Sequence, residues 1–118
     1  GPASEIDKMR KIFEQRRNLV QAKLDSRPYI SYVYPQGAFY FFINVSRAFN
    51  SQMGDKKITN SVEFATFLAE NFQLVTVPGI AFGADDYIRI SFAASQEQLE
   101  QGTQNLIQAM DRLMEAKR

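Results

Sequence analysis

The first part of the chain places apolar side chains at the spacing of an α-helix. The apolar positions are separated by three, four or seven residues and therefore share one helix face; they are Ile6, Met9, Phe13, Val20 and Leu24. The pattern predicts an amphipathic helix over residues 4–25 with Ser4 as its N-cap. The helix is expected to end before Pro28, because proline biases the preceding residue away from helical dihedral angles.

Two further helices are predicted by capping boxes that precede apolar residues at helical spacing. Asn60 and Glu63 have this spacing ahead of a helix that should end near Phe72. Ser95 and Gln98 have it ahead of the last helix. The buried face of that helix is expected to contain Leu99, Leu106, Ile107, Met110, Leu113 and Met114, with Thr103 as its one polar member.

Four segments rich in aromatic and β-branched residues are predicted as strands. They are residues 29–34, 38–45, 74–77 and 87–92. The first two flank a turn at residues 35–37, as a hairpin or as one bent strand. In the last strand Ile88 and Ile90 alternate with Arg89, so the arginine should lie on the opposite face of the sheet.

The order of these elements favours an α+β fold. Strands that are close in sequence tend to pair, which predicts a two-layer sandwich of a mostly antiparallel sheet of about four strands with helices on one face. Residues 46–59 are polar and without a period, and are predicted to form a surface loop. The second face of the sheet would be open to a group outside this chain.

Composition limits the chemistry of the chain. It has 118 residues, 45% of them hydrophobic, which fits one domain with a real core, and its net charge of +1 gives a weak case for nucleic acid. It has neither Cys nor His, so thiolate metal sites and the usual general base are absent, and we expect no metal. No apolar run approaches the roughly 20 residues of a membrane span, so a soluble, cytoplasmic protein is expected.

Arg89 is the strongest candidate for ligand binding. A guanidinium offers paired, planar donors that match a carboxylate, and a strand holds it rigidly. The alternative is an exposed arginine that lies over a neighbouring aromatic ring or pairs with Asp85 or Asp86. Two glycine segments, at Pro78-Gly79 and at Gly37, have a similar pair of interpretations: ordinary turns with aromatic core residues beside them, or the border of a ligand pocket.

Four segments in order carry a family resemblance. FEQRRNLVQAKL, PQGAFYFFINVS, VPGIAFGADDYIRISFAAS and the closing amphipathic helix resemble the C-terminal part of fold-type-I aminotransferases, in the branch of the bacterial aspartate aminotransferases. The resemblance covers residues 5–118, which it identifies as the small, C-terminal domain. Residues 1–4 are assigned to a linker or tag remnant, because Gly1-Pro2 is typical of what a tag-cleaving protease leaves.

The resemblance implies a role for each candidate. Arg89 corresponds to the arginine that receives the α-carboxylate of the amino-acid or 2-oxo-acid substrate, while Gly37, Pro78, Gly79 and Phe82 have structural roles near the site. The Schiff-base lysine and the other groups that hold pyridoxal phosphate belong to the family's large domain, so no catalytic or cofactor-binding residue is expected here. The isolated chain should be inactive, and the full-length parent should be a homodimer whose small domain closes over the active site.

A different class of function remains open at this stage. The chain could be a stand-alone α+β module that binds a small ligand or a protein partner through the open face of its sheet. A reading frame that continues upstream into a lysine-bearing cofactor motif would exclude this alternative.

Overall fold

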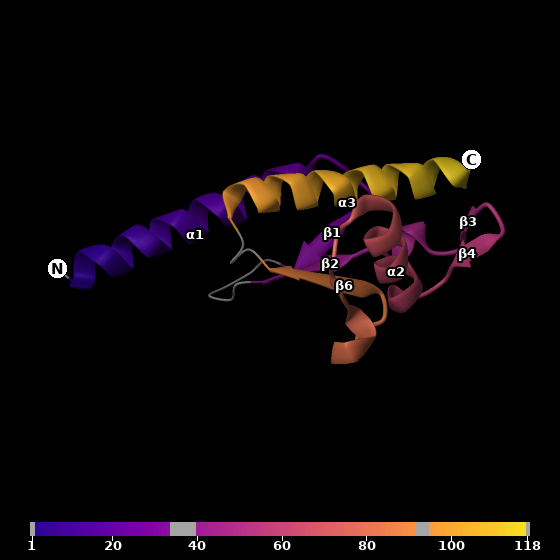
Figure 1. Cartoon of the computed structure of the whole chain (residues 1–118), viewed down its shortest axis with the longest axis horizontal. Coiled ribbons are helices and arrows are strands. Elements are labelled where there is room, and N and C mark those ends of the chain that lie inside the picture. Colours follow the sequence, from indigo (N-terminus) through magenta and orange to yellow (C-terminus); the bar gives the residue numbers. More distant parts are fainter. Residues whose placement is uncertain (1, 34–39, 92–94, 118) are drawn as a thin grey trace.

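The computed structural model describes residues 2–33, 40–91 and 95–117 (Figure 1). Three helices are present in this part of the chain: α1 (Pro2–Asp25), α2 (Ser61–Phe72) and α3 (Gln96–Ala116). The main sheet is antiparallel, with strand order β1-β2-β6-β5, and consists of β1 (Ser31–Val33), β2 (Tyr40–Asn44), β6 (Tyr87–Ser91) and β5 (Val77–Pro78). A second, two-stranded sheet pairs β3 (Ser51–Met53) with β4 (Lys56–Ile58).

The buried face of the main sheet is built by alternate residues of its two central strands. Phe41 and Ile43 on β2 are paired in register with Ile90 and Ile88 on β6, and all four are buried. Helix α3 and the second half of α1 lie side by side over the sheet (Figure 1). The fold is therefore the α+β architecture predicted from the sequence, with an antiparallel sheet of four strands.

Helix α1 begins earlier than its apolar pattern indicates. Ser4 lies inside the helix, which starts at Pro2, so the prediction of Ser4 as N-cap is wrong. A proline is compatible with the first turn because the amide hydrogen it lacks would have no helical partner there. Val20 and Leu24 are buried, whereas Ile6 and Met9 are 65% and 56% exposed on the half of the helix that extends beyond the domain (Figure 1).

Residues 46–59 are ordered structure, and the prediction of a surface loop is wrong. They form the 3-10 helix η1 (Ser46–Ala48) and the β3–β4 hairpin, whose turn contains Gly54 at a φ of 65°. The Oγ atom of buried Ser51 lies 2.5 Å from the carbonyl oxygen of Ala48 and 3.0 Å from that of Leu113 on α3. This contact joins the hairpin to the last helix.

The strand boundaries also differ from the predictions. β5 covers only Val77–Pro78, because the chain before it leaves the sheet and exposes Val75 at 87%. The predicted turn at residues 35–37, which contains Gly37, lies outside the described residues, and so does Phe92.

The N-caps predicted at Asn60 and Ser95 are present, but only the capping box at Ser95 is complete, because Glu63 binds Thr59 rather than the amide of Asn60. The side chain of Asn60 accepts a hydrogen bond from the amide of Glu63, and Ser95 and Gln98 form the complete capping box of α3. The carboxylate of Glu63 accepts from the side chain and the amide of Thr59, and these hydrogen bonds lower its pKa. Sequence spacing therefore located the start of both helices.

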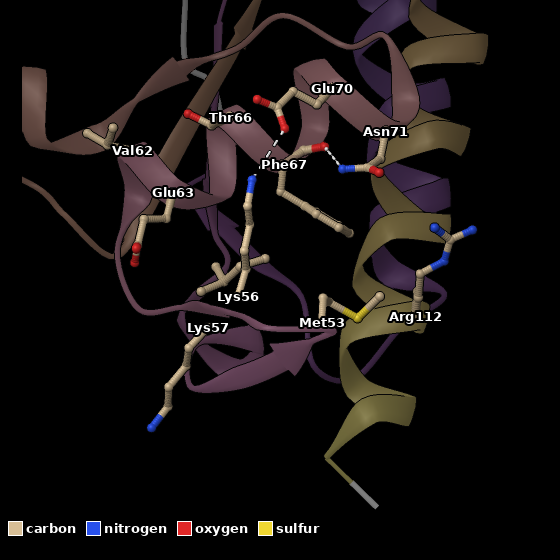
Figure 2. Close-up of a pocket in the computed structure, with 11 residues that line it drawn as sticks. Met53, Lys56, Lys57, Val62, Glu63, Thr66, Phe67, Glu70, Asn71 and Arg112 are labelled. Carbon is tan, nitrogen blue, oxygen red and sulfur yellow. Dashed lines mark hydrogen bonds and ion pairs between the residues drawn. The ribbon is translucent and has the colours of Figure 1, made fainter.

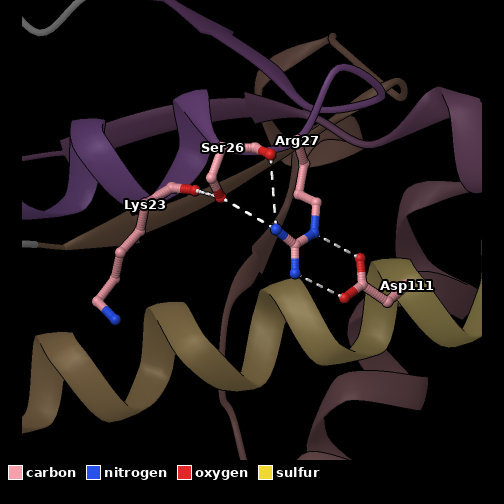
Figure 3. Close-up of polar contacts among 4 residues, drawn as sticks. All are labelled: Lys23, Ser26, Arg27 and Asp111. Carbon is pink, nitrogen blue, oxygen red and sulfur yellow. Dashed lines mark hydrogen bonds and ion pairs between the residues drawn. The ribbon is translucent and has the colours of Figure 1, made fainter.

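A bidentate ion pair joins the segment that follows α1 to helix α3 (Figure 3). Nε and Nη2 of Arg27 donate to the two carboxylate oxygens of Asp111 at 2.9 and 3.0 Å, as Figure 3 shows. The hydrogen bonds and charge of Asp111 raise the pKa of Arg27. Because both side chains remain about one-third exposed, solvent screens the pair, and its paired geometry is what distinguishes it from an ordinary surface contact.

We predict that Arg27→Ala lowers the free energy of unfolding by about 0.5–1 kcal/mol, because the exchange removes a bidentate contact between the segment after α1 and helix α3. Urea denaturation measures the loss. The control is Arg10→Ala, which removes the exposed pair of Arg10 with Asp7 within α1 and should change stability by less than about 0.5 kcal/mol. Equal losses in both variants would contradict a specific role for the pair of Arg27 with Asp111.

Candidate functional site

Arg89 lies on the face of the sheet that the helices do not cover. Its neighbours along β6, Ile88 and Ile90, are buried in the core, whereas Arg89 is half-buried on the opposite side. Across the sheet it is in register with Phe42 on β2 and Val77 on β5. The predicted face of the arginine is thus confirmed, and the position is central rather than at an edge.

Two aromatic rings contact the guanidinium of Arg89. Its Cζ atom lies 4.2 Å from the ring centroid of Tyr40 and 4.4 Å from that of Phe82. The ring of Phe82 in turn packs edge-on against Phe42, with centroids 5.7 Å apart. At these distances the positive charge interacts with the negative faces of the rings.

The N–H groups of Arg89 have no hydrogen-bond or ion-pair partner among the described residues. Pairing with Asp85 or Asp86, one alternative considered from the sequence, is absent there, and Asp85 binds Ser61 instead. The other alternative, a position over aromatic rings, is present. Contact of the guanidinium with two rings leaves its N–H donors free for another group, so the arrangement is compatible with binding a carboxylate.

The turn that carries Phe82 depends on a glycine. It is the 3-10 helix η2 (Gly79–Phe82), which begins directly after Pro78 of β5. Gly79 is buried, and a Cβ atom at this position would overlap the carbonyl oxygens of Ala84 and Tyr87. The backbone segments approach so closely here that only glycine fits at position 79 without displacing them.

A buried polar contact fixes the same turn to α2. The hydroxyl of Ser61, which is completely buried, donates to Oδ1 of Asp85 at 2.7 Å and accepts from the amide of Ile80 at 3.1 Å. The amide of Ser61 also donates to Oδ1 of Asp85 at 3.1 Å. These three bonds join the start of α2, η2 and the loop before β6. Because Phe82 is the last residue of η2, they help to fix its position relative to Arg89.

The surroundings of Arg89 do not form a site for pyridoxal phosphate. The guanidinium of Arg89 contacts the rings of Tyr40 and Phe82, and the six lysines lie elsewhere, on α1, on β4 and after α3. No lysine of the described residues lies near Arg89 to form a Schiff base, so we assign no step of cofactor chemistry to these residues. Among the described residues there is also no cluster of metal-ligating side chains, and no described helix is long and apolar enough to span a membrane.

A separate groove of about 650 Å³ lies between the β3–β4 hairpin, α2 and α3 (Figure 2). Met53 and Phe67 contribute apolar surface, and the charged side chains around it include Lys56, Glu70 and Arg112. Lys56 lies 4.0 Å from Glu70, and both are largely exposed. None of the residues around Arg89 lines this groove, and its mixed, solvated charges point to no ligand.

Comparison with known proteins gives consistent matches. A family model described as aminotransferase class I and II matches residues 2–106. An aspartate aminotransferase of Geobacillus stearothermophilus is 38% identical over 117 residues, which are 99% of this chain and 28% of that protein. A probable aspartate/prephenate aminotransferase of Rickettsia bellii (strain RML369-C) is 41% identical over 90 residues, 75% of this chain and 23% of that protein.

Solved structures agree with the sequence matches. The aspartate aminotransferase from Rhizobium meliloti has a TM-score of 0.86 and 30% identity, covering 95% of this chain and 28% of that one. The chain thus spans between 23% and 28% of the length of these relatives.

We predict that Gly79→Ala lowers the free energy of unfolding by about 1–3 kcal/mol, because the added methyl group must displace two carbonyl groups. Thermal or urea unfolding measures the change. The control is Gly102→Ala, where the new methyl group meets only the flexible end of the Leu74 side chain. Alanine also has a higher helix propensity than glycine, so the free energy of unfolding should change by less than about 1 kcal/mol. A Gly79→Ala protein as stable as the unsubstituted chain would show that the turn does not need the close approach.

Proposed function

The chain belongs to the class I and II aminotransferase family, and we propose that it forms the C-terminal small domain, residues 5–118, of such an enzyme. In this proposal Arg89 binds the α-carboxylate of the amino-acid substrate and of the corresponding 2-oxo acid. The supporting observation is a guanidinium that projects from the open face of a central strand with its in-plane donors unpaired among the described residues.

The surroundings of Arg89 favour an anionic ligand. The guanidinium keeps its charge at any physiological pH, and its two parallel donors fit the two oxygens of a carboxylate. The rings of Tyr40 and Phe82 displace part of the water around the half-buried guanidinium, which strengthens its attraction for an approaching carboxylate. Aspartate or glutamate side chains of this chain do not compete for the guanidinium within the described residues.

The remaining chemistry belongs, in this proposal, to the rest of a longer protein. The full-length protein would hold pyridoxal phosphate in its large domain, which supplies the electron sink needed for transfer of an amino group. The open sheet face and the exposed half of α1, with Ile6, Met9 and Ile12, are the surfaces we assign to contact with that large domain. The isolated chain would then have no transaminase activity.

Two further features of the parent are part of the proposal. The parent would act as a homodimer, in which the partner contributes to recognition of the substrate side chain. Its small domain would close over the bound substrate and exclude water from the reaction. The near-site positions Pro78, Gly79 and Phe82 would bring the strand of Arg89 to the active site, and Gly37 would border the adjacent strand.

We predict that Arg89→Ala in the full-length protein lowers kcat/KM for the amino donor by about 100-fold or more, mainly through KM, because a desolvated charge pair with the carboxylate is lost. Steady-state kinetics measure this effect with the amino acid that is turned over fastest in a panel that includes L-aspartate.

The matched control is Arg112→Ala. Arg112 also lies over an aromatic ring, with its Cζ atom 4.9 Å from the centroid of Phe72, but it lines the groove between α2 and α3 rather than the open sheet face. Its removal should leave kcat/KM within about twofold, a difference below about 0.5 kcal/mol. Kinetics that are unchanged in Arg89→Ala would refute the assignment of the carboxylate site.

A further inference from the structure

We infer that Tyr40 and Phe82 are positioning residues that set the orientation of the Arg89 guanidinium for the substrate carboxylate. The inference rests on the proposed function of Arg89 and adds the groups that make this arginine effective. It is carried by the two ring contacts, at 4.2 Å for Tyr40 and 4.4 Å for Phe82.

The two rings serve the arginine rather than the core. Tyr40 and Phe82 are 38% and 40% exposed, and neither is among the residues packed against the core cluster. They come from different parts of the chain, Tyr40 from the start of β2 and Phe82 from the end of η2. Their shared neighbour is the guanidinium of Arg89.

Orientation matters because a carboxylate accepts two parallel hydrogen bonds only from the edge of the guanidinium plane. A free arginine side chain has many rotamers, and ordering it on binding costs free energy on the order of 1–2 kcal/mol. Rings that already contact the guanidinium restrict those rotamers before the ligand arrives. The binding energy of the carboxylate is then not spent on ordering the arginine.

The position of Phe82 is itself secured by two contacts. Its ring packs edge-on against Phe42, which is in register with Arg89 on the adjacent strand. Its turn is fixed to α2 by the bond between the amide of Ile80 and the hydroxyl of Ser61. The rigid support of this ring is what an orienting role requires.

The inference is tested by steady-state kinetics of Phe82→Leu and Tyr40→Leu in the full-length protein. Each variant should raise KM for the amino donor about tenfold, equivalent to about 1.4 kcal/mol, with kcat within about twofold, because the carboxylate is bound equally in the ground and transition states. Phe82→Tyr and Tyr40→Phe keep a ring at each position and should stay within about twofold of the unsubstituted protein in KM. Val62→Ala, at an exposed apolar position on α2 that lines the separate groove, is the control and should leave KM unchanged.

A double-substitution cycle separates positioning from a general effect on folding. If the rings act through the guanidinium, Phe82→Leu should raise KM about tenfold in the protein that retains Arg89. In the protein that already carries Arg89→Lys, the same exchange should raise KM by less than about twofold. An equal rise in both backgrounds would overturn the inference, because the ring would then act independently of Arg89.

The kinetics also distinguish this inference from the proposed function. A large rise in KM for Arg89→Ala with no change in Phe82→Leu and Tyr40→Leu would overturn the positioning role alone. No change in any of the three variants would overturn both proposals. If a leucine variant fails to fold, Phe82→Met and Tyr40→Met replace it, because methionine also fills the space without a ring and should give the same tenfold rise in KM. An unchanged KM in a folded methionine variant would overturn the positioning role of that residue.

Discussion

The arrangement of the site depends on the two-residue period of strand β6. Ile88 and Ile90 must face the core, so Arg89 must face the other way. A slip of one residue in the pairing with β2 would bury a guanidinium and expose two isoleucines, which is costly enough to fix the register. The same burial that stabilises the domain therefore presents the arginine on the open face.

Polar contacts fix the η2 turn, which carries Phe82, beside Arg89. The buried hydroxyl of Ser61 connects α2, the η2 turn and Asp85, and the close approach at Gly79 lets the turn fold tightly beside β6. The ion pair of Arg27 with Asp111 lies on the other face of the sheet, where it joins the segment after α1 to helix α3.

The sequence predicted those features that follow from short-range patterns. Alternation located the face of Arg89, and capping boxes located the starts of α2 and α3. It did not predict the hairpin at residues 51–58, because three-residue strands are too short to show a period.

Contacts between distant residues were also beyond the sequence pattern. Ser61 and Asp85 are 24 residues apart, and Tyr40 lies far from Arg89 along the chain, so nothing local indicates that they meet. The contact of Phe82 with Arg89 required the geometry of the turn between them, although the family resemblance had already placed Phe82 near the site.

A crystal structure of the full-length protein with a bound carboxylate analogue of its substrate tests the role of Arg89 most directly. Both oxygens of one carboxylate should lie about 2.7–3.0 Å from two nitrogen atoms of Arg89. A carboxylate bound by other groups, with Arg89 directed away from it, would show that this arginine does not bind the substrate.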